Sequence, residues 1–162
     1  MANILIPTDF TTSFTTTVNQ VIQFIDRKPV NIILFHAFEI PFYVQDIFTK
    51  SARQPYNELL TDDFRQACKQ LKDQHPKAIG KIGFKCMHGS TAAVFRNFVD
   101  ANDVDAIICP DDYVHLKVHE RSVNPTLFFN KAGIPVLNDF KPVRKQNEFN
   151  VITLSKPQME LN

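Results

Sequence analysis

The sequence predicts an α/β fold in which repeated β-α units build one parallel sheet. The first observation behind this prediction is that short apolar runs alternate with helical patterns from end to end of the chain. The second is that most of these runs are continuously apolar, as strands buried on both faces of a sheet are. The third is the length of 162 residues, which fits one compact domain with a single core.

Five strands and four helices follow from these patterns. The expected strands lie at residues 3–7, 30–36, 81–87, 105–109 and 134–137. The expected helices lie at residues 14–25, 55–74, 91–101 and 124–132. A polar linker at 141–148 then leads to a sixth strand candidate at 149–154. We therefore expect residues 1–140 to form the α/β domain and residues 141–162 to form a C-terminal extension.

The first two strands are predicted to be buried, because the run at 3–7 is apolar and the run at 30–36 is rich in β-branched and aromatic residues. The helix between them, 14–25, has its apolar residues at spacings of three and four, which indicates one buried face. A turn that contains Asp9 separates the first strand from this helix. Several Thr and Ser residues in that turn can cap the helix.

The third strand, 81–87, is expected at an edge of the sheet, because its apolar and polar residues alternate. The long helix before it carries one apolar face and ends at His75 and Pro76. Between the second strand and this helix lies a connection, 37–53, that is rich in large apolar side chains. We expect it to pack over the carboxyl edge of the sheet or to form a partner-binding surface, and in either case to shield that edge.

The last two units begin with the helix at 91–101, which has one apolar face. Pro110 ends the fourth strand. Asn124 before Pro125 predicts the start of the last helix, because Asn caps free N–H groups and Pro is tolerated at the first helical position. Gly133 ends that helix before the fifth strand.

Composition excludes several classes of protein. The net charge is +1 and no basic run occurs, so nucleic acid is not an expected partner. No leader or membrane-spanning stretch is visible, and no membrane association is expected. The cysteines, Cys68, Cys86 and Cys109, are odd in number and lack metal-binding spacing. Reduced thiols fit a cytoplasmic location.

The order of these pieces resembles the universal stress protein family over roughly residues 3–140. The resemblance rests on the run from Ile4 to Phe10, the run from Ile32 to Phe38, the turn at 87–90, and the strands 105–108 and 133–137. It implies a Rossmann-like doubly wound sheet of five parallel strands, in the order 3-2-1-4-5, with flanking helices. Ligands in such sheets bind beyond the carboxyl ends of the strands, here in a crevice between the first and fourth strands. The resemblance also implies a homodimer through the fifth strand.

The loop with which family members hold ATP is not matched. The resemblance implies a Gly, two residues, a Gly, nine residues, a Gly and then Ser or Thr, starting where the fourth strand ends. Here the glycine positions hold Pro110, Tyr113 and Val123, and a register shifted by two offers Arg121 and Ser122. Pro110 has no N–H to donate, and Tyr and Val resist the positive φ that an anion-cradling turn needs. We therefore expect no ATP binding in the family mode.

The candidate binding residues are those that the fold gathers near the crevice. They are Pro7, Thr8, Asp9, His36, Gly89, Pro110, Asp111 and Ser122, with Asp112 beside them. For Asp9, a role beside a nucleoside and a role in capping the first helix both remain open. His36 is expected to be a hydrogen-bonded packing residue, and clustered aspartates are expected to be solvated surface. We expect no catalytic residue, no metal and no cofactor, with ATP or AMP as the alternative.

The sequence thus favours a non-enzymatic, dimeric stress-response or regulatory module, with an unidentified protein as a further partner. The alternative is a protein that binds a nucleotide or another small molecule in the crevice. Two enzyme classes lack a required residue. A haloacid-dehalogenase-type phosphatase needs an Asp where Thr11 stands, and a receiver domain needs an Asp at the end of the third strand, where Cys86 to His88 stand. The 149–154 strand is expected either to cover its own fifth strand or to cross to a second subunit, and we favour the exchange.

Overall fold

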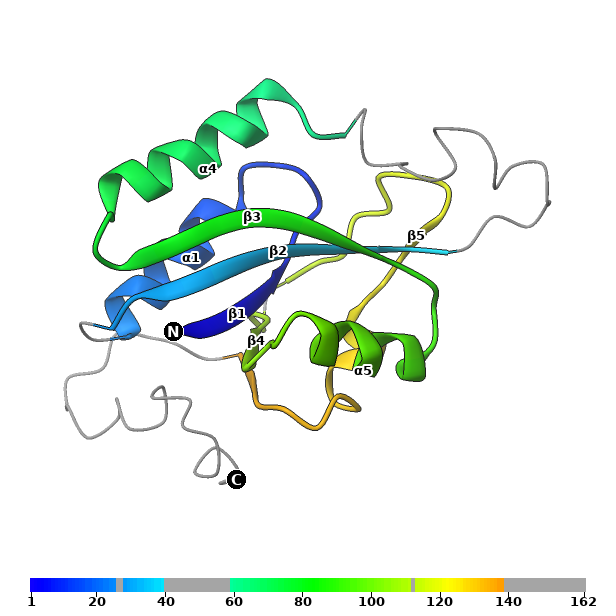
Figure 1. The fold of residues 1–162 in the computed structure, drawn as a ribbon. Helices are drawn as coiled ribbons and strands as arrows, with labels where there is room; N and C mark the ends of the chain where they lie inside the picture. The colour runs from blue at the N-terminus through cyan, green and yellow to red at the C-terminus, as the bar shows by residue number, and fades with distance from the viewer. Residues whose placement is uncertain (26–27, 40–58, 112, 139–162) are drawn as a thin grey trace.

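The structure is a computed structural model, and it describes residues 1–25, 28–39, 59–111 and 113–138 (Figure 1). The strands are β1 (Ala2–Pro7), β2 (Val30–Phe38), β3 (Ile79–His88), β4 (Ala106–Ile108), β5 (Ser122–Val123) and β6 (Val136–Leu137). The helices are α1 (Phe14–Phe24), α4 (Asp62–Gln74), α5 (Ala92–Ala101) and α6 (Thr126–Phe129). The predicted strand at 149–154 and most of the predicted connection at 37–53 lie outside the described residues.

The sheet has the order β3-β2-β1-β4-β6, and all pairs along this path are parallel. The predicted order is therefore confirmed, with β6 in the place of the expected fifth strand. β1 and β2 pair along their length, from Ala2 opposite Val30 to Pro7 opposite Phe35. β3 lies at one edge, as its alternating pattern predicts. The first and fourth strands are neighbours, so the carboxyl ends of β1 and β4 meet at the switch point of the sheet.

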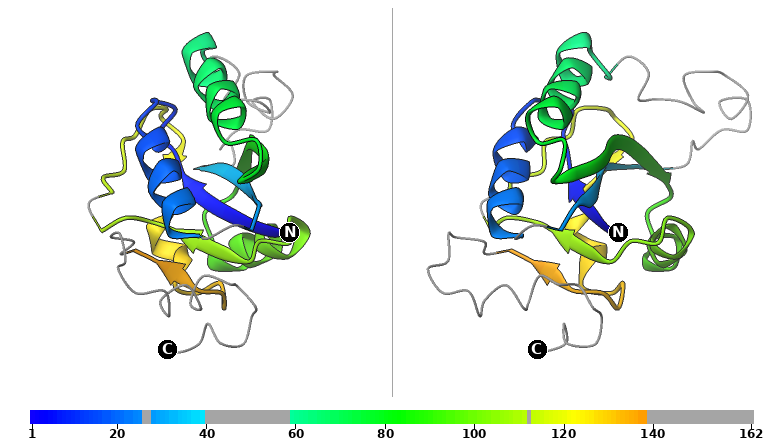
Figure 2. Two further views of the ribbon diagram at one scale, coloured as in Figure 1. Left: turned by 90° about the vertical axis from the view of Figure 1, so that its left-hand side faces the viewer. Right: turned by 60° about the vertical axis from the view of Figure 1, so that its left-hand side comes forward.

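Helices cover both faces of the sheet (Figure 2). Alternate residues of the central strands point to opposite faces. Ile4 and Ile6 pack in the core under α1 and α4, whereas Leu5 packs in the core under α5 and α6. Two separate cores on one sheet explain why the sequence runs of the central strands are continuously apolar. A doubly wound α/β fold is the result.

Several elements are shorter or longer than the sequence predicts. α4 begins at Asp62 because Thr61 caps it, with the Thr61 hydroxyl accepting from Phe64 N at 3.1 Å. α6 has four residues, and Pro125 is its N-cap. The Asn124 side chain instead accepts hydrogen bonds from the backbone and the hydroxyl of Thr126. This Asx turn uses the oxygen that was expected to cap a longer helix.

One strand was not predicted at all. β5 pairs with β2 in an antiparallel manner, with Ala37 opposite Val123 and Phe38 opposite Ser122. Glu39 N continues this contact by donating to Arg121 O at 2.7 Å. The segment after β4 is therefore folded back against the carboxyl end of β2. Among the described residues, no helix is long and apolar enough to cross a membrane.

Candidate functional site

A cavity of about 300 Å³ lies at the switch point, between the carboxyl ends of β1 and β4 and the first turns of α1. Of the predicted crevice residues, Pro7, Thr8, Asp9 and Pro110 line it together. Asp111 is exposed and is not among the lining residues, and Asp112 lies outside the described residues. Much of the remaining lining is hydroxyl and amide groups from α1: Ser13, Thr16, Thr17 and Gln20.

Asp9 is buried in the turn between β1 and α1. Its Oδ1 accepts hydrogen bonds from Thr11 N at 3.0 Å and from Thr11 Oγ1 at 2.5 Å. The N-cap of α1 is Ser13, and no side chain caps that helix. Asp9 therefore stabilises the turn before the helix instead of the helix itself. Asp9 is also the acidic residue among those that line the cavity in the described chain.

Tyr113 also lines the cavity, and it was not predicted from the sequence as a polar group of the site. Its hydroxyl is buried and has no hydrogen-bond partner among the described residues. Burial, and then the negative charge of Asp9, raise the pKa of Tyr113, so the phenol stays protonated and can donate. The signal in the sequence is its place three residues after Pro110, where it was considered only as a substitute for a glycine.

His36 does not line this cavity. Its ring forms hydrogen bonds that join β2 to Thr8 and to β5. It is 1% exposed, and its Nδ1 lies 2.8 Å from the carbonyl oxygen of Thr8. A carbonyl only accepts, so Nδ1 carries the proton, and Nε2 accepts from the Ser122 hydroxyl at 2.8 Å. Burial lowers the pKa of His36 to about 4, which keeps this ring neutral. The rings of Phe10 and Phe38 pack against it, each at a centroid distance of 4.8 Å.

Two predicted candidates, His36 and Ser122, are thus partners in one buried contact between β2 and β5. Gly89 lies elsewhere, in the turn after β3. It has φ +134°, and a Cβ there would lie 3.0 Å from a methyl carbon of Val94. Its N–H donates to Phe38 O at 2.7 Å. Gly89 therefore has a backbone conformation, with positive φ, that residues with a side chain rarely adopt.

Two kinds of reactive group, metal-binding clusters and activated thiols, are absent among the described residues. No group of three His, Cys, Asp or Glu side chains among them is placed to hold a metal ion. Burial raises the pKa of each of Cys68, Cys86 and Cys109 to about 11, so these thiols carry little nucleophilic thiolate at neutral pH.

Comparison with known proteins gives similarity at the level of the fold. Neither a family model nor a curated protein matches the sequence. The crystal structure of hypothetical protein PH0823 matches with a TM-score of 0.52 and 17% identity, covering 90% of this chain and 99% of the other. Hypothetical protein MJ0577 matches with a TM-score of 0.50 and 20% identity, covering 89% and 96%.

A universal stress protein family member from Burkholderia pseudomallei matches less closely, with a TM-score of 0.46, 13% identity, and coverage of 86% and 96%.

The strand order, the crevice at the switch point and the first two matches agree on one architecture. The chain therefore has the doubly wound α/β fold that its resemblance to universal stress proteins predicts.

Proposed function

We propose that the protein is a non-enzymatic module of the universal-stress-protein type, acting in stress response or regulation without binding ATP in the mode of that family. The observation that carries this proposal is the position of the segment after β4. The end of this segment is paired as β5 with β2, and Ser122 is hydrogen-bonded to His36 there. The three described cysteines are free, half-buried thiols, which also supports a cytoplasmic location.

The electrostatics of the cavity support the same proposal. Its one charged lining residue in the described chain is Asp9, and no Lys or Arg lines it. An anion-binding nest alternates right- and left-handed backbone, but none of the described residues from 110 to 125 has a positive φ. A triphosphate placed here would meet the carboxylate of Asp9, and no Lys or Arg of the described lining would offset that charge.

Calorimetry with Mg-ATP on the full chain tests the proposal. We expect no saturable heat at concentrations up to the millimolar range. Binding in the micromolar range would overturn it. In that case Asp9→Ala, which removes the charged group of the cavity, would show whether the nucleotide occupies the crevice, and Asp111→Ala would serve as the matched acidic control, since Asp111 does not line the cavity.

The second candidate is a small-molecule binding protein. Tyr113 favours it, because this residue lines the cavity with Asp9 and its hydroxyl has no hydrogen-bond partner within the described part of the chain. A buried polar group without a partner costs free energy that a ligand recovers. The lining suits a neutral or cationic molecule with hydroxyl or amine groups. Crystallographic density in protein purified without additives tests it. Density bonded to Tyr113 Oη and lost in Tyr113→Phe supports the candidate, and a crevice that holds only water contradicts it.

A further inference from the structure

Two polar side-chain atoms that follow β4 are buried without partners. In the described chain, three buried side-chain nitrogen or oxygen atoms have no hydrogen-bond partner, and two of these are Tyr113 Oη and His115 Nδ1. Both belong to an irregular segment between β4 and β5, residues 113–118, which we call the strap. A buried polar atom without a partner destabilises the folded state. Two such atoms therefore lie in one short stretch of chain.

The strap buries its polar groups and exposes its apolar ones. Val114 and Leu116 are 70% and 47% exposed, whereas Tyr113 Oη and His115 Nδ1 are buried. Apolar side chains gain free energy on burial, and polar atoms without partners gain it on hydration. Turning the strap outward would therefore hydrate the two polar atoms and would lose little burial at Val114 and Leu116.

The backbone of the strap does not bind it to the sheet. Residues 114–118 make no backbone hydrogen bond within the described part of the chain. The strap is held at its ends, where Tyr113 N donates to Pro110 O at 3.0 Å and Ser122 N donates to His119 O at 2.9 Å. Segments with few backbone hydrogen bonds and little buried apolar surface open at a fraction of the free energy of global unfolding.

His115 is the group of the strap whose charge changes near neutral pH. Its ring stacks on His36 of β2 at a centroid distance of 6.0 Å, and a charge on His115 disfavours one on His36. Burial lowers the pKa of His115, Asp9 in the turn after β1 opposes this effect, and Lys117 of the strap adds to it. An open strap would hydrate His115 and let it take up a proton at a higher pH, so acid favours the open strap.

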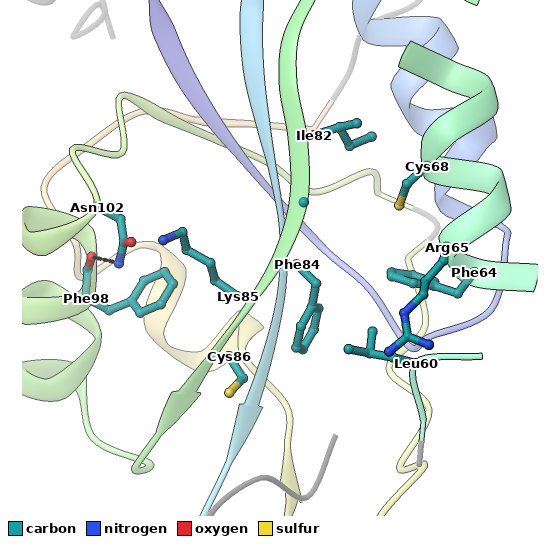
Figure 3. A pocket seen from close by; sticks show the side chains of 11 residues that line it. Leu60, Phe64, Arg65, Cys68, Ile82, Phe84, Lys85, Cys86, Phe98 and Asn102 are labelled. Carbon is teal, nitrogen blue, oxygen red and sulfur yellow. Dashed lines mark hydrogen bonds between the residues drawn. The ribbon is translucent and has the colours of Figure 1, made fainter. Parts of the chain in front are cut away.

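The strap also forms part of the wall of the crevice between β1 and β4. Tyr113 and Val114 are among the residues that line that cavity of about 300 Å³. No residue of the strap lines the larger hollow of about 690 Å³ beside β3, to which α4 and α5 contribute instead (Figure 3). Movement of the strap would therefore change access to the crevice and leave the larger hollow as it is.

We propose that the strap is a gate of the crevice, which opens while the rest of the protein stays folded, and that protonation of His115 favours the open state. In the closed state the polar atoms of Tyr113 and His115 are buried, and the strap completes the wall of the crevice. In the open state both side chains are hydrated, and a small molecule can enter or leave on this side. The gate goes beyond the proposed function and does not depend on whether the crevice takes a nucleotide.

Acetylation of Tyr113 by N-acetylimidazole tests the gate, because the buried hydroxyl reacts only when the strap is open. Mass spectrometry of peptides from the full chain gives the rate at Tyr113, and its ratio to the rate in the urea-unfolded chain at the same pH gives the open fraction. We expect low concentrations of urea to leave this rate unchanged, since local opening exposes little surface. From pH 7.5 to pH 5.5 the open fraction should rise about threefold to tenfold.

Histidine variants assign the pH dependence. His115→Phe keeps an aromatic ring beside His36 and removes the nitrogens that titrate, so it is expected to abolish most of the pH dependence at Tyr113. His75→Phe, at the end of α4, is the matched control and should retain it. A rate at Tyr113 that rises with urea in step with global unfolding, an open fraction that does not change with pH, or a pH dependence that survives His115→Phe would overturn the proposal.

Tyr113→Phe gives a second measurement that does not depend on acetylation. Removing a hydroxyl that has no partner in the described chain is expected to leave Tm equal to or above that of the wild type. Ser122→Ala instead removes a hydroxyl that is bonded to His36, and it should lower Tm. A fall in Tm for Tyr113→Phe as large as that for Ser122→Ala would mean that the Tyr113 hydroxyl stabilises the closed strap, and it too would overturn the proposal.

Discussion

His36 Nε2 lies 2.8 Å from Ser122 Oγ, and this hydrogen bond joins β2 to β5 inside the protein. Both side chains are buried. The same imidazole donates from Nδ1 to the carbonyl of Thr8, so one ring connects the ends of two neighbouring strands with the segment that follows β4. The contact fixes the position of that segment over the sheet.

Ser122→Ala is expected to lower the free energy of unfolding by about 1–3 kcal/mol, because Nε2 of His36 is left buried without a donor. Urea titration at pH 7.5 measures this change. Ser90→Ala, in an exposed loop, is the matched control and should cost less than about 0.5 kcal/mol. Equal costs for the two substitutions would argue against an energetic role for the His36 contact.

Stability is expected to fall as the pH drops from 6.5 toward 4. The unfolded chain protonates His36 near its ordinary pKa of 6.5, whereas burial lowers the pKa in the folded protein to about 4. Between these pH values the unfolded state binds more protons than the folded state. The contribution of neutral His36 to the free energy of unfolding is therefore complete above pH 6.5 and is lost on acidification. This lowers the free energy of unfolding by roughly 3 kcal/mol.

This pH dependence is checked by urea unfolding of the wild type and of His36→Gln at pH 7.5 and 4.5. Burial also lowers the pKa of His88 and of His115, so the difference between the two proteins isolates the share of His36. His36→Gln should lose clearly less stability on acidification. Parallel losses in both proteins would mean that His36 does not contribute.

Gly89→Ala is expected to destabilise the protein by about 1–3 kcal/mol, since a side chain at φ +134° is strained and would crowd Val94. Gly83→Ala provides the comparison within the same strand-and-turn region. It has no positive φ and meets open space, so its effect on Tm should be small. Equal Tm values for the Gly89→Ala and Gly83→Ala variants would contradict the strained turn at Gly89.

The full chain is expected to be a homodimer. Among the described residues, β6 has an unpaired edge of only two residues, Val136 and Leu137, so it offers few main-chain groups for pairing. We therefore expect the C-terminal extension to carry much of the contact, and truncation after Phe140 to give a monomer. Light scattering at micromolar concentration measures both species. A monomeric full chain would refute the expectation, and a dimeric truncated chain would assign the contact to β6.

The sequence is informative about the strands and less so about the segment after β4. The continuous apolar runs around Ile4 and Ile32 predict central strands, because each packs against helices on both sides. β5 has two residues, which is too short to show any periodicity. β5 is held by a hydrogen bond between Ser122 and His36, which are 86 residues apart in the chain. A contact between residues so far apart produces no periodicity in the sequence around either of them.

In the candidate site, too, the residues that directly follow strands could be predicted, whereas those in the segment after β4 could not. Thr8, Asp9 and Pro110 follow strands directly, so the topology alone brings them together. Tyr113 and Ser122 are several residues beyond β4, and their positions depend on how that segment folds back. Sequence reasoning therefore named Ser122 without its partner and did not name Tyr113 as a polar group of the cavity.

The pairing of β5 with β2 also has a kinetic consequence. Ser122 and His36 are separated by 86 residues, so closing this contact costs much chain entropy unless β1, β2 and β4 have already assembled. We expect it to form after the transition state for folding, so that its loss accelerates unfolding and leaves the refolding rate nearly unchanged. The same segment would then be among the first to open under native conditions, giving His36 transient access to solvent without unfolding of the central strands.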